Sequence, residues 1–205
     1  MNKAPLICME DIVKIFPPSK VALDNVSIKI NEGEVHAIIG ENGAGKSTLM
    51  KVLYALEKPN SGTISINGKK VDFNSPKDAV AMGIGMVHQE FMLIPGYSII
   101  ENIMLGYESV DKFGFIDRNK AKERFRKVAE AIKFDIDPDE KVENLSVAVQ
   151  QKVEIIKQLY REVNILILDE PTLCFRHPWF SSLLHSEIIQ TSSSIKLRLS
   201  QGSEV

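Results

Sequence analysis

The sequence is poor in cysteine and in net charge, and it contains no long apolar run. Its 205 residues include only 2 cysteines, Cys8 and Cys174, too few for a disulfide scaffold, which indicates a reducing cytoplasm. The net charge of −2 leaves no electrostatic footprint for nucleic-acid binding. No segment approaches the roughly 18 apolar residues of a membrane span, and Glu10, Asp11 and Lys14 interrupt the stretch where a signal peptide would be apolar.

The sequence does contain a glycine-rich phosphate loop. The pattern G-x-x-x-x-G-K-[ST] is matched with Gly40, Gly45, Lys46 and Ser47 at the fixed positions. A polyphosphate needs several inward-pointing N–H groups, and glycine lets the backbone approach closely at φ > 0. Lys46 can then reach the β- and γ-phosphates, and the Ser47 hydroxyl can hold Mg²⁺. The predicted nucleotide-binding residues are Gly40, Glu41, Asn42, Gly43, Ala44, Gly45, Lys46, Ser47 and Thr48.

The flanks of this loop have the expected pattern. Residues 34–39 form a short apolar run that predicts a buried strand, and residues 47–56 have helical periodicity. A helix that begins at the loop would place its positive dipole end under the phosphates. The alternative, a glycine-rich turn that happens to contain lysine, does not account for these flanks.

Elsewhere the N-terminal half predicts strands and the middle predicts helices. Asn67-Gly68 is a strong hairpin signal, and Ser75-Pro76 indicates the start of a helix. Strands are expected over 6–16, 22–30, 63–66 and 85–89, with a short helix over 75–82. Two longer helices are expected, one over 118–134 with the stripe Ala121, Phe125, Val128 and Ile132, and one from Ser146 with the stripe Val149, Val153, Ile156 and Tyr160.

A second motif is the apolar run 165–168 followed by Asp169 and Glu170. In a phosphate-loop enzyme the strand beside the loop ends in an Asp that holds Mg²⁺, a role that Asp169 fits. Glu170 lies one residue further, where its carboxylate could polarise a water that attacks the γ-phosphate. The alternative is a strand that merely ends in two acids, and the phosphate loop favours the first interpretation.

The order of these motifs resembles that of ATP-binding-cassette (ABC) ATPases. Gln89 follows a strand, Leu145-Ser146 begins a helix, and Ile-Leu-Ile-Leu-Asp-Glu-Pro-Thr ends at residue 172. The details similar to the branch that serves importers of simple sugars and nucleosides are Gly40-Glu-Asn-Gly-Ala-Gly, Val87-His-Gln-Glu, Glu101-Asn-Ile and Leu145-Ser-Val followed by Gln150-Gln151. The resemblance covers roughly residues 5–172. Members of that branch usually carry two cassettes in one chain, and this sequence resembles the first one, cut short.

The resemblance implies roles for particular residues. Phe16 would stack on adenine, although a core aromatic at a strand end is an equally simple interpretation. Gln89 would touch Mg²⁺ and the attacking water, so the implied metal ligands are Ser47, Gln89 and Asp169 and the implied catalytic residues are Gln89 and Glu170.

We call residues 145–151 the signature segment. The resemblance implies that Leu145, Ser146, Val147, Ala148 and Gln150 contact the γ-phosphate of ATP held by a second cassette, paired head to tail. Val147 and Ala148 replace two glycines of the commonest form; valine is usual in this branch, whereas the methyl group of Ala148 is expected to weaken this pairing without abolishing it. The apolar run 91–95 has two open interpretations, core packing or a groove for a helix of a membrane subunit.

The resemblance stops after Thr172. Residues 173–205 are expected to be an aberrant and poorly ordered tail, in which neither His177 nor His185 has the preceding strand that would place a switch histidine. A frameshift would explain the break, because Leu173–His177 can be coded CTG-TGC-TTT-CGC-CAC, which two bases later reads Val-Leu-Ser-Pro. Without further strands, one flank of the strand over 165–168 is expected to be unpaired.

The sequence therefore predicts an α/β phosphate-loop fold with a mixed central sheet, an N-terminal antiparallel β layer and a helical subdomain over about 90–145, within a cassette domain over 1–172. The implied function is the ATP- and Mg²⁺-binding subunit of an ABC importer for simple sugars or nucleosides, at the cytoplasmic face of the membrane. Its expected partners are a second cassette, membrane permease subunits and, indirectly, a solute-binding protein, without nucleic acid. This 205-residue chain is itself expected to hydrolyse ATP very poorly. The alternatives are a truncated nucleotide-binding fragment without hydrolysis and a soluble cassette ATPase outside transport.

Overall fold

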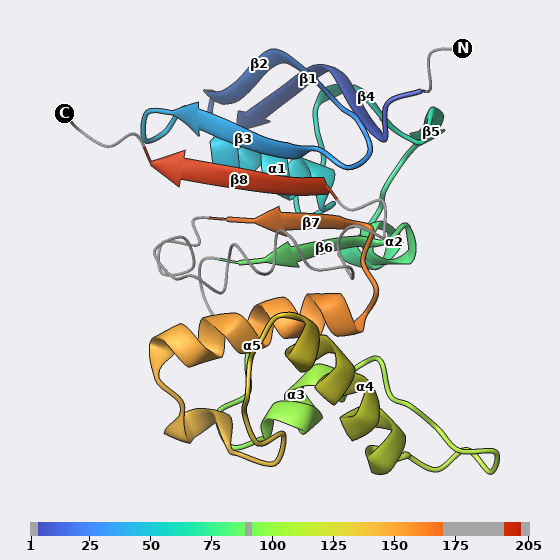
Figure 1. Cartoon of the computed structure of the whole chain (residues 1–205). Coiled ribbons are helices and arrows are strands. Elements are labelled where there is room, and N and C mark those ends of the chain that lie inside the picture. Colours follow the sequence, from blue (N-terminus) through green and yellow to red (C-terminus); the bar gives the residue numbers. More distant parts are fainter. Residues whose placement is uncertain (1–3, 89–91, 170–194, 202–205) are drawn as a thin grey trace. The chain divides into compact units, whose positions relative to one another are not determined.

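The computed structural model describes residues 4–88 and 92–169 together with the backbone of residues 195–201. The chain divides into two compact units (Figure 1). The first unit comprises Met1–Met86, Asn164–Glu170 and Ser193–Val205, and the second comprises Val87–Val163 and Pro171–Ser192. Within the described residues, no helix is both long enough and apolar enough to cross a bilayer.

The first unit begins with the predicted antiparallel β layer. The strands β1 (Ile7–Phe16), β2 (Lys20–Ile30), β4 (Ser61–Ile66) and β5 (Lys69–Val71) form one sheet in the order β2-β1-β4-β5. The turn between β4 and β5 places Asn67 and Gly68 at φ 50 and φ 73, as the Asn-Gly hairpin signal predicts. This confirms the expected strands and their local connection.

The second sheet of this unit carries the phosphate loop. It consists of β3 (Val35–Gly40), β6 (Ile84–Val87), β7 (Ile165–Leu168) and β8 (Ile195–Gln201), in the order β3-β8-β7-β6. The strand β8 runs parallel to both β3 and β7 and lies between them (Figure 1). The phosphate loop and the acidic strand are therefore separated by one strand of the same sheet.

The strand β8 corrects one expectation. We expected an unpaired flank on the strand over 165–168, yet β7 has β6 on one side and β8 on the other. The sequence of β8 alternates Ile195, Leu197 and Leu199 with polar residues, a period of two that favours a strand. The expectation of poor order for 173–194 and 202–205 falls outside the described residues, as do the two histidines named above.

The buried character predicted for β3 is also wrong. Burial alternates along this strand, and Val35 and Ile39 are 59% and 73% exposed. An apolar run taken as doubly buried thus has one exposed face and one half-buried face among the described residues.

The helix α1 (Lys46–Leu53) joins the core of the first unit. A short second helix, α2 (Pro76–Ala81), begins with the predicted Ser75 cap, which forms a capping box with Asp78. The core draws apolar side chains from both sheets and α1: Leu6, Ile7, Met9, Ile12, Leu23, Ile30, Leu49, Met50, Val52, Leu53, Tyr54, Ile64, Ile66, Ala79, Ile84, Met86, Ile165 and Ile167.

The second unit is helical. It contains α3 (Ile99–Met104), α4 (Arg118–Ala131), the short 3₁₀ helix η1 (Val142–Asn144) and α5 (Val147–Tyr160). All four residues of the predicted α4 stripe are buried: Ala121, Phe125, Val128 and Ile132. The helix α5 belongs to this unit, in which it packs with α3 and α4.

Candidate nucleotide site

The phosphate loop adopts the backbone that its glycines predict. Gly43 and Gly45 have φ 84 and φ 85, a left-handed conformation that strains any other residue. A Cβ atom at Gly45 would lie 2.3 Å from the carbonyl oxygen of Ala22, so β2 runs directly against the loop. Glycine is therefore required at position 45 for two reasons, the left-handed backbone conformation and the close approach of the neighbouring strand.

The helix α1 begins immediately after this turn, with Gly45 as its N-cap. Its first turn holds no acidic residue, so its N–H groups and positive dipole end are not neutralised locally. Lys46 is 9% exposed, and its Nζ donates to the carbonyl oxygens of Gly40 at 2.6 Å and Glu41 at 2.8 Å. The ammonium group is thus held within the loop, where it can exchange these carbonyl oxygens for phosphate oxygens.

A cavity of about 170 Å³ lies over the loop. Among the described residues, its lining combines an aromatic residue, two lysines, hydroxyl groups and loop backbone and includes no acidic residue: Phe16, Lys20, Ala22, Asn42, Gly43, Gly45, Lys46, Ser47 and Thr48. Phe16 therefore lies at the same cavity as the phosphate loop, which is the placement that adenine stacking requires. Lys14 Nζ lies 4.9 Å from the centroid of the Phe16 ring, a cation–π contact that helps to orient the ring.

The two oxygen ligands proposed for a divalent cation meet in the structure. Ser47 Oγ lies 3.1 Å from Asp169 Oδ1, although the residues are 122 positions apart in the chain. Asp169 is 6% exposed. A hydroxyl and a carboxylate oxygen fit Mg²⁺, which usually takes one or two protein oxygens and completes its octahedron with waters and phosphate oxygens.

The remaining predicted residues lie either outside the described residues or in the second unit. Gln89 and Glu170 lie outside the described residues. In the second unit, Ser146 is the N-cap residue of α5, and Val147 and Ala148 are exposed on its first turn. Gln150 Nε2 donates to the carbonyl oxygen of Leu145 at 3.0 Å, a bond that joins the first turn of α5 to the residue before its N-cap.

Sequence reasoning missed a polar anchor beneath the segment that follows Gln89. Met92 N–H donates to Glu154 Oε1 at 2.7 Å, and Lys157 Nζ donates to the Met92 carbonyl oxygen at 3.4 Å. Glu154 and Lys157 are 4% and 7% exposed, and burial lowers the pKa of Lys157 while the Glu154 carboxylate opposes that shift. Their spacing of three on a predicted helix was visible, but their common partner was not.

A buried asparagine anchors the same segment two residues later. Ile94 N–H donates to Asn102 Oδ1 at 2.7 Å, and Asn102 Nδ2 donates to the Ile94 carbonyl oxygen at 3.0 Å. Met92, Ile94 and Tyr97 remain 61%, 38% and 44% exposed. Of the two interpretations of the apolar run, the described part thus favours a surface strip over core packing.

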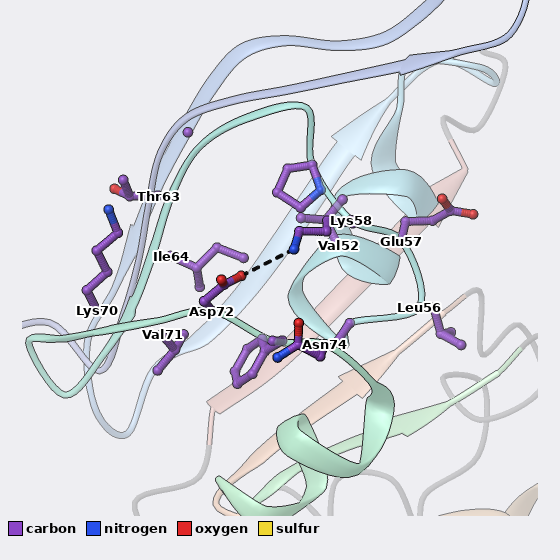
Figure 2. Close-up of a pocket in the computed structure, with 14 residues that line it drawn as sticks. Val52, Leu56, Glu57, Lys58, Thr63, Ile64, Lys70, Val71, Asp72 and Asn74 are labelled. Carbon is purple, nitrogen blue, oxygen red and sulfur yellow. Dashed lines mark ion pairs between the residues drawn. The ribbon is translucent and has the colours of Figure 1, made fainter.

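A larger cavity of about 460 Å³ lies elsewhere in the first unit (Figure 2). It lies between the end of α1 and the β4–β5 hairpin, and an ion pair of 3.7 Å between Lys58 and Asp72 crosses it. Glu57 and Lys70 also line it, so its charges are mixed. It lacks the glycine loop, the helix N-terminus and the cluster of donors that distinguish the smaller cavity.

Comparison with known proteins agrees with this geometry. The family model described as "ABC transporter" matches residues 23–173. The guanosine import ATP-binding protein NupO of Bacillus subtilis (strain 168) is 48% identical over 167 residues, covering 82% of this chain and 32% of the relative. The nucleoside import ATP-binding protein NupA of Lactococcus lactis subsp. cremoris (strain MG1363) is 40% identical over 205 residues, covering 100% of this chain and 38% of the relative.

Solved structures give the same answer for the fold. CbiO1 from Clostridium perfringens, part of the ABC transporter complex cbiONQ, has a TM-score of 0.78 at 25% identity and covers 97% of this chain and 79% of that one. A nucleotide-free ATP-binding cassette from an ABC transporter has a TM-score of 0.78 at 27% identity and covers 96% of this chain and 81% of that one. The chain spans about a third of the length of the curated relatives it matches. It belongs to the ABC transporter family and has the nucleotide-binding cassette fold of that family.

Proposed function

We propose that the chain is an ATP-binding cassette of an importer for simple sugars or nucleosides. The observation that carries the proposal is the meeting of Phe16, the phosphate loop and Lys46 at one cavity, with the Ser47–Asp169 oxygen pair in the same unit. The relatives named above are import ATP-binding proteins for nucleosides, and a glucose import ATP-binding protein of Haloferax volcanii is 42% identical over 199 residues. These names support the solute class.

Each of these residues has a proposed role in binding the nucleotide or in its hydrolysis. Phe16 stacks on the adenine ring, the loop N–H groups and Lys46 bind the β- and γ-phosphates, and Ser47 and Asp169 hold Mg²⁺. A bound Mg²⁺ neutralises charge that develops on the phosphate oxygens during hydrolysis. Gln89 and Glu170, which follow the buried strands β6 and β7 in the sequence, are proposed to position and polarise the attacking water.

The proposed partners follow from the half-site on α5. The exposed first turn of this helix, at Val147 and Ala148, is proposed to contact the γ-phosphate of ATP bound by a second cassette. The exposed strip at Met92, Ile94 and Tyr97 is proposed to face a membrane permease subunit. This assembly would hold the chain at the cytoplasmic face of the membrane, with a solute-binding protein acting through the permease and no nucleic acid involved.

Calorimetric titration of the purified chain with ATP tests the nucleotide site. Binding with Mg²⁺ is expected, and Asp169→Asn is expected to reduce the Mg²⁺-dependent part of the affinity while leaving the Mg²⁺-free part unaltered. Absence of ATP binding to the folded wild type would contradict the proposal.

The transport assignment needs a separate experiment. We expect the chain to cofractionate with membranes when permease subunits encoded beside its gene are coexpressed, and to lose that association in their absence. Copurification with ribosomes or DNA instead would favour a soluble cassette ATPase.

A further inference from the structure

The nucleotide cavity contains a lysine that no motif assigns. Lys20 lines the cavity together with Phe16 and the phosphate loop, and it precedes Ala22 by two residues on β2. The close approach of Ala22 to Gly45 holds this part of β2 against the loop. Side chains two positions apart on a strand share a face of the sheet, and Lys20 and Ala22 both line the cavity.

The register of the first hairpin places Lys20 beside the aromatic residue. Lys20 and Phe16 are direct Cα partners of the antiparallel β1–β2 pair. Side chains of directly opposed residues stand on the same face of a sheet, about 5 Å apart at Cβ. Lys20 is thus at the end of the cavity where the base is proposed to stack, whereas Lys46 lies at the loop.

The charges around the cavity also distinguish Lys20 from its neighbours. Lys46 donates to Gly40 and Glu41, and Lys14 forms an ion pair with Glu57 at 2.8 Å and donates to the Lys58 carbonyl oxygen at 2.9 Å. The Lys20 side chain has no hydrogen bond or ion pair with the described part of the chain. Among the described residues, the Lys20 ammonium group has no partner and the cavity lining contains no carboxylate, so this end of the cavity suits an anionic group.

We propose that Lys20 is a second phosphate-binding cation of this site, which contacts the phosphate nearest the nucleoside. The inference rests on the proposed nucleotide binding and assigns different phosphates to the two lysines. Lys46 recognises the β- and γ-phosphates, and Lys20 recognises the α-phosphate beside the stacked base. Lys20 therefore contributes to the affinity for a nucleoside monophosphate as well as for a triphosphate, whereas Lys46 contributes only when a β-phosphate is present.

The test is a competition titration of the full 205-residue chain against a fluorescent ATP analogue, with ATP, ADP, AMP and adenosine as competitors. Lys20→Ala is expected to weaken ATP, ADP and AMP by the same factor, about threefold to tenfold for one exposed charged contact, and to leave adenosine unaltered. Lys20→Arg retains the charge and should restore most of the affinity. Raising the salt concentration should shrink the difference between wild type and Lys20→Ala.

Lys29→Ala is the matched control, because Lys29 is an exposed lysine of the same strand that pairs with Glu10 away from the cavity. It should leave all four affinities unaltered. If wild type and Lys20→Ala bind ATP with equal affinity, this inference is overturned and the proposed function stays intact. The same holds if Lys20→Ala weakens the binding of ATP and ADP but not that of AMP. A folded wild type that binds no ATP would overturn the proposed function and this inference with it.

Discussion

The phosphate loop and the signature segment differ in how much of their site the chain itself supplies. At the phosphate loop, the aromatic residue, the cations and the glycine backbone all line one cavity of the first unit, and Lys46 is 9% exposed. At the signature segment, Ser146 caps α5 without a side-chain cap bond and Val147 is 55% exposed. The first brings the proposed contacts for base and phosphates to one cavity, and the second is an open helix end that fits the proposed role of a half-site for another cassette.

The two regions are also held in place by different physical means. The phosphate loop is fixed by backbone sterics, since the conformation at Gly45 and its contact with Ala22 exclude a side chain. The helix α5, which begins within the signature segment, is tied to Met92 by the buried polar side chains of Glu154 and Lys157. We therefore expect steric substitutions to damage the loop and charge substitutions to damage the helix.

The largest expected effect is at the buried anchor on α5. Glu154→Ala leaves the Met92 N–H without its acceptor and Lys157 without the nearby opposite charge, which should cost about 3–5 kcal/mol of unfolding free energy. Glu154→Gln keeps an oxygen acceptor and should lose less. Urea unfolding measures the stability, and amide hydrogen exchange at Met92 measures the anchor; unaltered exchange at Met92 in Glu154→Ala would contradict the assignment.

The next effect is steric and lies in the phosphate loop. Gly45→Ala should cost about 2–5 kcal/mol, because the left-handed backbone costs about 1–2 kcal/mol and the clash with Ala22 adds about 1–3 kcal/mol. Gly43→Ala is the matched control, since the φ of 84 at Gly43 is close to the φ of 85 at Gly45 but a Cβ there meets nothing within 4 Å. It should cost only the backbone term. Equal losses in urea unfolding would show that the contact with β2 is unimportant.

The loop should also dominate the affinity for ATP. Lys46→Ala removes the cation that lies against Gly40 and Glu41, and charge-assisted hydrogen bonds are worth about 1.5–3 kcal/mol each. The affinity should therefore fall by roughly tenfold to a hundredfold. Lys51→Ala, an exposed lysine of the same helix, is the control in a titration with a fluorescent ATP analogue. Equal affinities of wild type and Lys46→Ala would mean that the loop is not the site.

The features that sequence could predict are those set by neighbouring residues. The positive φ angles of Gly43 and Gly45, the Asn67-Gly68 turn and the Ser75 cap each depend on a few adjacent positions, and the structure has all of them. The helix α3 was missed although Ser98 and Glu101 form a capping box, a signal that the short length of the helix obscured.

The features that sequence could not predict depend on distant partners. The place of β8 between β3 and β7 is a choice of neighbours that the alternation of Ile195, Leu197 and Leu199 does not specify. The exposure of Val35 and Ile39 likewise depends on what covers β3. In the candidate site, the motifs gave Lys46 and the pair of Ser47 with Asp169, but Lys20 and the anchor of Met92 required the register of one hairpin and the packing of one helix.

The smallest expected effect lies in the signature segment and addresses the comparison directly. Ala148 is exposed on the first turn of α5, so its methyl group supports no packing of the described chain. If this turn faces the γ-phosphate of a second cassette, Ala148→Gly keeps the N–H donor, removes the methyl group from the contact and should strengthen ATP-dependent dimerisation. We expect a gain in dimer affinity of about twofold to fivefold, equivalent to about 0.4–1 kcal/mol.

Glycine also costs about 0.5–1 kcal/mol in a helix, so Ala131→Gly at the end of α4 serves as the control for helix stability. Sedimentation velocity at saturating ATP measures the dimer, and an Ala148→Gly variant with unaltered dimerisation would contradict the proposed half-site while leaving the phosphate loop as the ATP site.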